Sequence, residues 1–156
     1  MYLELDAETG FIRFLGHWAV DDCGRIINPL LVEEQVRGGI VQGICSALYE
    51  ECIHSGDGSM INPTLAEYLV PMAGEMPDIH VDHIESPQGS TQLGAKGVGE
   101  VGTIPVAAAI ISAVEDALRP FGVTIRQTPI PPSTLFEMID DARLLVPDMG
   151  GEVVVA

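Results

Sequence analysis

Glu100 is the side chain whose surroundings in the sequence could best support chemistry. It lies in the stretch GAKGVGEVGTIP, residues 94–105, where four glycines fall within nine residues. Glycine allows positive φ and lets the backbone approach another group closely. A carboxylate presented by such a loop and shielded from water could act as a general base. Lys96, the only lysine of the chain, precedes Glu100 by four residues and is a candidate charged neighbour.

The same loop contains the spacing GxGxxG, formed by Gly97, Gly99 and Gly102. A dinucleotide-binding loop needs a strand that runs directly into the first glycine and an acidic residue about twenty positions later. The preceding strand candidate ends near Glu85, and the acidic Glu100 would repel a pyrophosphate. Two interpretations remain, a glycine-rich connection with an incidental acid and a loop that presents a base.

A second polar surface is expected on a helix over residues 29–52. Its members recur at spacings of three and four, which places them on one face: Gln35, Gly38, Gly39, Gln42 and Ser46. One interpretation is tight helix packing through Gly39 and Gly43, with the glutamines at a solvated edge. The other is the floor of a groove for a polar heterocycle, because a glutamine amide both donates and accepts hydrogen bonds. The sequence leaves both open.

The pattern of elements that positions these residues predicts an α+β fold in a single domain covering residues 1–156. Alternation around a glycine-containing turn predicts an N-terminal β-hairpin, about 2–6 and 11–20. Asn28 and Pro29 predict the start of the long glycine-containing helix. The remaining expected elements are an irregular or briefly helical segment 64–78, a strand 79–85, a glycine-rich loop 86–102, a buried helix 103–118 capped by Thr103, a brief strand 123–127, and a C-terminal helix 131–145. The tail after about 147 is expected to be disordered.

Composition narrows the class of protein. The 156 residues are 47% hydrophobic, enough for a real core, and 7 basic against 23 acidic residues give a net charge of -16. Such acidity disfavours nucleic acid and anionic membrane as partners. Cys23, Cys45 and Cys52 lack CxxC spacing, so we expect no metal site and reduced thiols. No signal peptide or apolar run long enough to cross a bilayer is present, and we expect a cytoplasmic protein.

Two long motifs resemble one known family. VDDCGRIINPLLVEEQVRGGIVQGICSALYEE and LGAKGVGEVGTIPVAAAIISAVEDAL closely resemble the C-terminal part of the molybdopterin-binding large subunit of the xanthine oxidase family. That family includes xanthine dehydrogenases, aldehyde oxidoreductases and aerobic carbon monoxide dehydrogenases, and VDDCGRIINP looks most like the last type. The resemblance covers roughly residues 2–142.

The resemblance implies a molybdenum hydroxylase, an oxidoreductase, and places roles on residues. Glu100 matches the family glutamate that lies beside the molybdenum and acts as the base. The residues implied to contact the cofactor are Gln35, Gly39, Gln42, Gly43, Lys96, Gly97, Val98 and Gly99. No side chain of this chain is implied to ligate the metal.

The resemblance also implies what other polypeptide must supply. The cofactor would be molybdopterin with molybdenum, in the cytosine dinucleotide form, shared with a remaining large-subunit segment or chain. FAD and 2Fe-2S centres would lie only on flavin and iron–sulfur partner subunits. The alternative is a non-catalytic remnant or interaction domain without cofactor, which could form a homo-oligomer to cover exposed surface.

Overall fold

A computed structural model of the chain describes residues 1–145 and 153–155. The fold is α+β, as expected. Its elements are β1 (Tyr2–Asp6), β2 (Ile12–Asp21), α1 (Pro29–Leu48), the short 3-10 helix η1 (Ala73–Glu75), β3 (Ile79–His83), α2 (Val106–Ala117), the 3-10 helix η2 (Arg119–Phe121), α3 (Pro132–Leu145) and β4 (Val153–Val155).

The four strands form one mixed sheet in the order β3-β2-β1-β4. β1 and β2 are the expected hairpin and pair antiparallel, while β3 runs parallel to β2 from His17↔Ile79 to Asp21↔His83. The hairpin turn ends at Gly10, whose φ of 74° favours glycine and whose missing Cβ leaves room for the Pro132 carbonyl at the start of α3. The turn thereby fixes where α3 packs.

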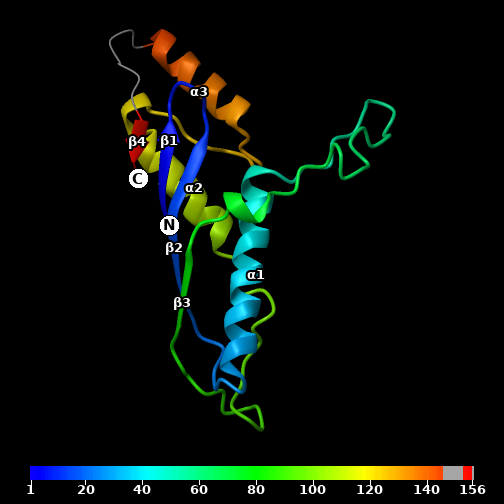
Figure 1. Cartoon of the computed structure of the whole chain (residues 1–156), viewed down its shortest axis with the longest axis vertical. Helices are drawn as coiled ribbons and strands as arrows, with labels where there is room; N and C mark the ends of the chain where they lie inside the picture. The colour runs from blue at the N-terminus through cyan, green and yellow to red at the C-terminus, as the bar shows by residue number, and fades with distance from the viewer. Residues whose placement is uncertain (146–152, 156) are drawn as a thin grey trace.

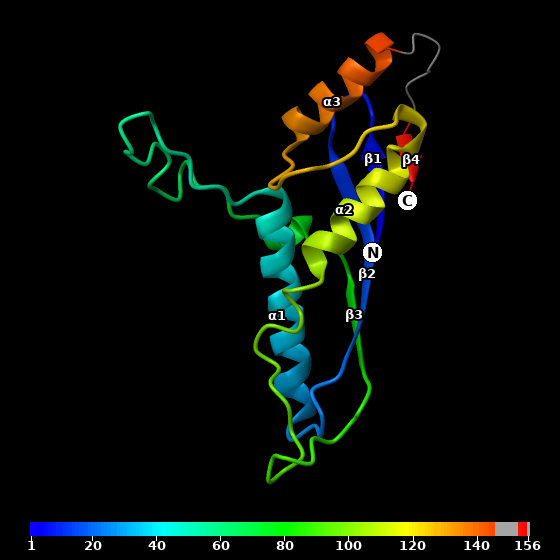
Figure 2. The ribbon, with the colours of Figure 1, turned by 180° about the vertical axis from the view of Figure 1, so that it is seen from behind.

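The core lies between this sheet and the helices α1 and α2, which cover one of its faces (Figure 1, Figure 2). β1 contributes Leu3 and Leu5, α1 contributes Ile40 and Ile44, and all four are fully buried. The other face of the sheet carries exposed Trp18 and Val20. The described part of the chain therefore leaves one face of its sheet uncovered.

The helix expected over 103–118 begins later and is less buried than predicted. It starts at Val106, and Pro105 occupies the N-cap without a side-chain hydrogen bond, so the Thr103 cap is wrong. Only one stripe is buried, namely Val106, Ile110, Val114 and Ala117. The small alanines between these residues tolerate partial exposure, so an almost wholly apolar sequence did not require burial on every side.

Three other expectations are also corrected. Residues 123–127 form no strand, because Ile125 N instead donates to the Glu115 carboxylate at 2.8 Å. Residues 153–155, expected to be disordered, form β4 beside β1. The rest of the tail, 146–152 and 156, lies outside the described residues. α1 ends at Leu48, four residues before its expected end.

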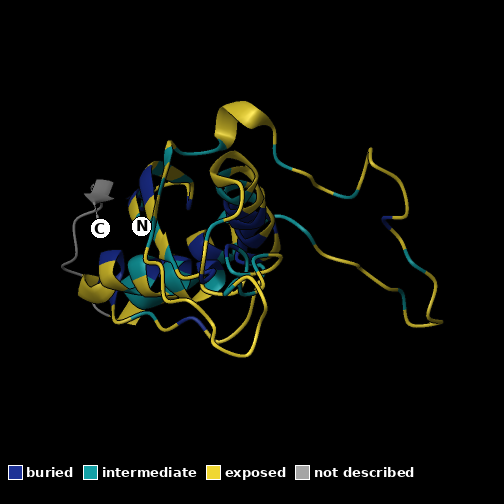
Figure 3. Cartoon of the chain, turned by 90° about the horizontal axis from the view of Figure 1, so that it is seen from below, coloured by how far each residue is buried: buried dark blue, intermediate teal, exposed yellow. Residues whose placement is uncertain are grey.

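The segment after α1 forms an arm, defined here as residues 50–72, that reaches away from the body of the fold (Figure 1, Figure 3). Within the arm, Asn62 joins the outgoing and returning segments, because it accepts from Ile53 N at 2.9 Å and donates to Glu51 O at 2.6 Å. The arm presents apolar side chains to solvent, including Leu65 at 84% and Leu69 at 59% exposure. No helix in the described part of the chain has the length and apolar character of a membrane span.

Candidate functional site

The glycine-rich loop lies against the first half of α1. Gln35 projects from that helix, and its Nε2 donates to the carbonyl oxygen of Gly99 at 2.9 Å. Gly102 meets the same helix so closely that an added Cβ would collide with the Val36 carbonyl oxygen. Two regions that the sequence analysis singled out separately therefore form one site.

Two of the three glycines of α1, Gly39 and Gly43, serve helix packing, whereas Gly38 is exposed. A Cβ on Gly43 would lie 2.6 Å from the Val106 Cβ of α2, and one on Gly39 would lie 3.1 Å from Thr103 N. Thr103 Oγ1, which was expected to cap α2, donates instead to Gly39 O at 3.0 Å. Gly39 and Gly43 are buried in this contact, which favours the packing interpretation for both. Gln35 and Gln42 remain exposed beside it.

Lys96 does not pair with Glu100. Its ammonium group lies 2.6 Å from Asp22 Oδ2, at the end of β2. The hydrogen bond from Lys96, together with one from Gly24 N, holds the pKa of Asp22 below its usual range. Asp22 was not among the site residues expected from the sequence, because its partner is 74 residues away in the chain. Lys96 thus fastens the loop to the sheet.

Glu100 is exposed at the outer side of the loop. Its backbone carbonyl accepts from Thr103 N at 3.0 Å and Ile104 N at 3.1 Å, which forms the turn before α2. Six consecutive backbone N–H groups, those of residues 97–102, donate to no partner among the described residues. Unpaired amides of this kind are available to a ligand or to another polypeptide. The described residues do not shield the Glu100 carboxylate from water.

A cavity of about 400 Å³ opens between the loop and the start of α1. Its walls combine expected residues, Gln35, Lys96, Val98 and Gly99, with residues the sequence analysis had not selected, among them Arg25 and Asn28. Arg25 and Asn28 belong to the motif DDCGRIINP, which the sequence analysis quoted. No pattern in the neighbouring residues indicated that this motif would lie opposite residues 94–99. Cβ atoms added at Gly97 or Gly99 would meet nothing within 4 Å, so the loop borders open space.

Comparison with known proteins shows which family the chain resembles. Residues 1–77 match the molybdopterin cofactor-binding domain. The chain is 41% identical over 132 residues to the nicotine 6-hydroxylase large subunit of Paenarthrobacter nicotinovorans, covering 85% of this chain and 16% of that protein. It is 36% identical to the carbon monoxide dehydrogenase large chain of Hydrogenophaga pseudoflava, covering 78% of this chain and 15% of that one. The crystal structure of quinoline 2-oxidoreductase from Pseudomonas putida 86 superposes with a TM-score of 0.86 at 42% identity, covering 89% of this chain and 18% of that one.

The chain belongs to the molybdopterin-binding large subunits of the xanthine dehydrogenase, carbon monoxide dehydrogenase and aldehyde oxidoreductase family. It spans less than a fifth of the length of the relatives it matches. Most of a family large subunit therefore lies outside this sequence.

The cavity beside the loop fits one side of a molybdopterin site. The pterin ring system carries several hydrogen-bond donors and acceptors, and the Gln35 amide together with the free N–H groups of residues 97–99 offers complementary ones. Among the described residues there is no group of three or more His, Cys, Asp and Glu side chains that could hold a metal ion.

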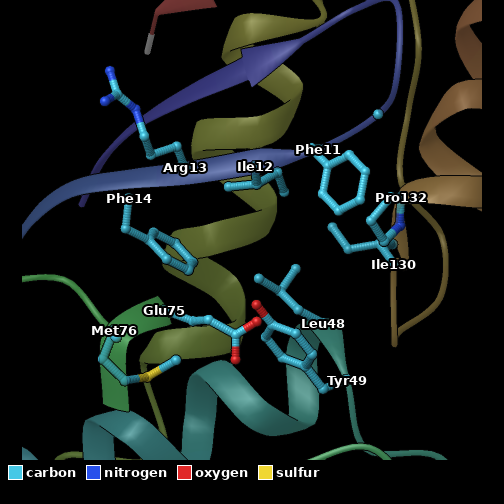
Figure 4. A pocket seen from close by; sticks show the side chains of 12 residues that line it. Phe11, Ile12, Arg13, Phe14, Leu48, Tyr49, Glu75, Met76, Ile130 and Pro132 are labelled. Carbon is cyan, nitrogen blue, oxygen red and sulfur yellow. The ribbon is translucent and has the colours of Figure 1, made fainter. Parts of the chain in front are cut away.

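A second cavity, of about 250 Å³, lies at the other end of α1 (Figure 4). Phe11, Phe14 and Met76 supply apolar walls, and Tyr49 and Glu75 supply the polar groups. Burial raises the pKa of the Tyr49 hydroxyl, as does the nearby Glu75 carboxylate. None of the residues selected from the sequence lines this cavity.

Proposed function

We propose that this chain is a segment of a molybdenum hydroxylase large subunit and contributes the catalytic base and part of the molybdopterin site. The observation that carries the proposal is the contact of Gln35 with Gly99, because it joins the polar helix face to the residue next to Glu100. Family membership and the cavity beside these residues support it. The cytosine dinucleotide form of the cofactor is part of the proposal.

The bound cofactor would supply the two-electron redox chemistry of hydroxylation. Glu100, on the loop beside the cavity, would accept the proton lost by the oxygen that attacks the substrate carbon. Gln35 would hold the Gly99 carbonyl and so fix the direction in which the next residue leaves the loop. The N–H groups of residues 97–99 would donate to the cofactor, and electrons would leave through iron–sulfur and flavin subunits.

The remaining large-subunit polypeptide is the partner we propose for the uncovered surfaces. Glu100 is exposed here, and a base needs a shielded environment to be tuned for its task. The arm and the outer sheet face also expose large apolar side chains, such as Leu65 and Trp18, that a complete subunit would cover. In these two relatives, more than four fifths of the large subunit lies outside the part that matches this chain, and the corresponding polypeptide would cover these surfaces.

The decisive experiment compares Glu100→Gln with the wild type in the assembled enzyme. Wild-type enzyme is assayed with nicotine and quinoline, an aldehyde and carbon monoxide, and molybdenum per large subunit is measured by mass spectrometry. Removing a general base costs roughly 10²–10⁴-fold in rate, so we expect kcat to fall by that factor at unchanged molybdenum content. Glu137→Gln, the same change at an exposed position of α3, should leave kcat unaltered. Near-normal turnover of the Glu100 variant would refute the catalytic role.

A non-catalytic, self-associating domain is the competing proposal, and the exposed apolar surface is what favours it. It predicts metal-free protein in the native source and a dimer that buries the arm. Native mass spectrometry separates the two: a chain recovered with a larger subunit and a pterin supports the enzyme, whereas a metal-free homodimer supports the remnant.

A further inference from the structure

In the loop that carries Glu100, none of the backbone N–H groups of residues 97–102 donates a hydrogen bond to another described residue. Its position must therefore be set from outside that stretch. The Glu100 carbonyl accepts from Thr103 N and Ile104 N, and three side-chain contacts add to this turn. Gln35 holds the Gly99 carbonyl, Thr103 Oγ1 binds Gly39 O, and the Lys96 side chain binds Asp22. The first two attach the loop to α1, and the third attaches it to the sheet.

The Asp22 carboxylate, one residue after the end of β2, accepts hydrogen bonds from three segments of the chain, at Gly24, Ser86 and Lys96. Its Oδ1 accepts from Gly24 N at 2.8 Å and from Ser86 N at 3.3 Å, while its Oδ2 accepts from Lys96 Nζ at 2.6 Å. Both ends of the loop 86–96 are thus attached to one carboxylate. Backbone bonds from Lys96 N to Cys23 O at 2.7 Å and from Arg25 N to Gly94 O at 3.0 Å continue the same attachment.

We infer that Asp22 is a positioning residue that holds Glu100 in place through Lys96. This inference rests on the proposed function. Three residues separate Lys96 from Glu100, and two of them are glycine, so the backbone between these two side chains is flexible. The turn that Thr103 N and Ile104 N form with the Glu100 carbonyl holds the loop only on its other side. The Asp22–Lys96 pair is charge-assisted and only partly exposed, at 34% and 31% of the side chains, which favours a defined geometry.

The two oxygens of Asp22 have separate partners, and this allows a precise variant. Asp22→Asn keeps an acceptor for Gly24 N and Ser86 N but places an amide NH₂ against the Lys96 ammonium. It therefore breaks only the contact with the Lys96 side chain, while the backbone bonds from Lys96 N to Cys23 O and from Arg25 N to Gly94 O remain. A base displaced by about 1 Å can lose roughly 10²-fold in rate, so we expect kcat of the assembled enzyme to fall between 10- and 100-fold, with KM little changed.

Lys96→Gln should match the defect of Asp22→Asn, and the double variant should be no worse than either single variant, because the two side chains act as one contact. Lys96→Arg, which can keep the ion pair, should recover most of kcat. Glu4→Gln weakens a partly exposed ion pair between Glu4 on β1 and Arg13 on β2, away from the loop, and should leave kcat unchanged. Strictly additive losses in the double variant, or no rescue by arginine, would overturn the inference.

Hydrogen–deuterium exchange gives a readout independent of turnover. In the assembled enzyme, Asp22→Asn should accelerate exchange of the paired amides of Gly94 and Lys96 while leaving α1 and β2 protected. Unchanged exchange there overturns the inference even if Glu100→Gln is inactive. Conversely, normal turnover of Glu100→Gln would show that Glu100 is not the base. If Asp22→Asn still accelerates exchange at Gly94 and Lys96 in that case, the attachment of the loop by Asp22 remains supported.

Discussion

The Gln35 side-chain amide donates to the Gly99 carbonyl oxygen over 2.9 Å, between residues 64 positions apart in the chain. This bond joins the helix α1 to the loop that precedes α2. It also fixes the orientation of the residue next to Glu100. Gln35 and Gly99 also line the same cavity, so a substitution of either residue should change the position of the other.

Gln35→Glu should weaken cofactor retention. The change keeps the size of the side chain but replaces its donor NH₂ with a carboxylate oxygen, which repels the Gly99 carbonyl. We expect molybdenum per large subunit in the assembled enzyme to fall several-fold, measured by inductively coupled plasma mass spectrometry. Gln127→Glu, at an exposed position away from the cavity, is the matched control and should retain full occupancy. Equal occupancy in both variants would argue against Gln35 as a cofactor contact.

Two glycine-to-alanine changes in α1 should have opposite effects on stability. Gly43→Ala places a Cβ 2.6 Å from the Val106 Cβ and should lower the free energy of unfolding by about 1–3 kcal/mol. Gly38→Ala meets nothing within 4 Å and should raise it by about 0.5–1 kcal/mol, since alanine has the higher helix propensity. Urea denaturation of the purified chain measures both. Destabilisation of similar size at both positions would contradict the packing described for Gly43.

His17 should make the chain less stable in mild acid. Its side chain is 5% exposed, and burial lowers the pKa of the imidazole below its ordinary value of 6.5. Below pH 6.5 the unfolded chain therefore binds a proton that the native chain resists, and stability falls as the pH falls. The contribution cannot exceed about 1.4 kcal/mol per pH unit.

His17→Gln should flatten this part of the pH dependence between pH 7 and 5.5, measured as the urea midpoint at each pH. His80→Gln, on the exposed face of the sheet, is the control and should follow the wild type. Parallel curves for His17→Gln and wild type would assign the pH dependence to other groups.

Asn28→Ala should destabilise α1 by about 1 kcal/mol. The Asn28 Oδ1 accepts from Leu31 N at 3.4 Å and caps the helix, as its position before Pro29 predicts. Asn28→Ser offers an equivalent acceptor and should remain near wild-type stability. Thermal unfolding followed by circular dichroism compares the two, and an alanine variant as stable as the serine variant would show that the cap contributes little.

Much of the architecture was predictable because its signals are local. Alternation over residues 2–20 predicted the hairpin, and the Asn28-Pro29 pair predicted where α1 begins. Caps, turns and periodic apolar residues act over a few positions, so they can be identified without knowing the rest of the fold. Thr103 shows the limit of this approach: it has the right position and chemistry for a cap, but its hydroxyl binds Gly39 O instead.

The sequence alone determined the family, the fold class and the presence of Glu100 in a glycine-rich loop. Only the tertiary structure decided the partners of Lys96 and of the α1 glycines. Asp22 lies 74 residues from Lys96, and Gly43 is separated from Val106 by the arm and the loop. Such pairs form when the core between sheet and helices closes, and their energies depend on distances that no local pattern encodes. The Glu100 carboxylate is exposed among the described residues, so the contacts that this segment makes do not shield it from water.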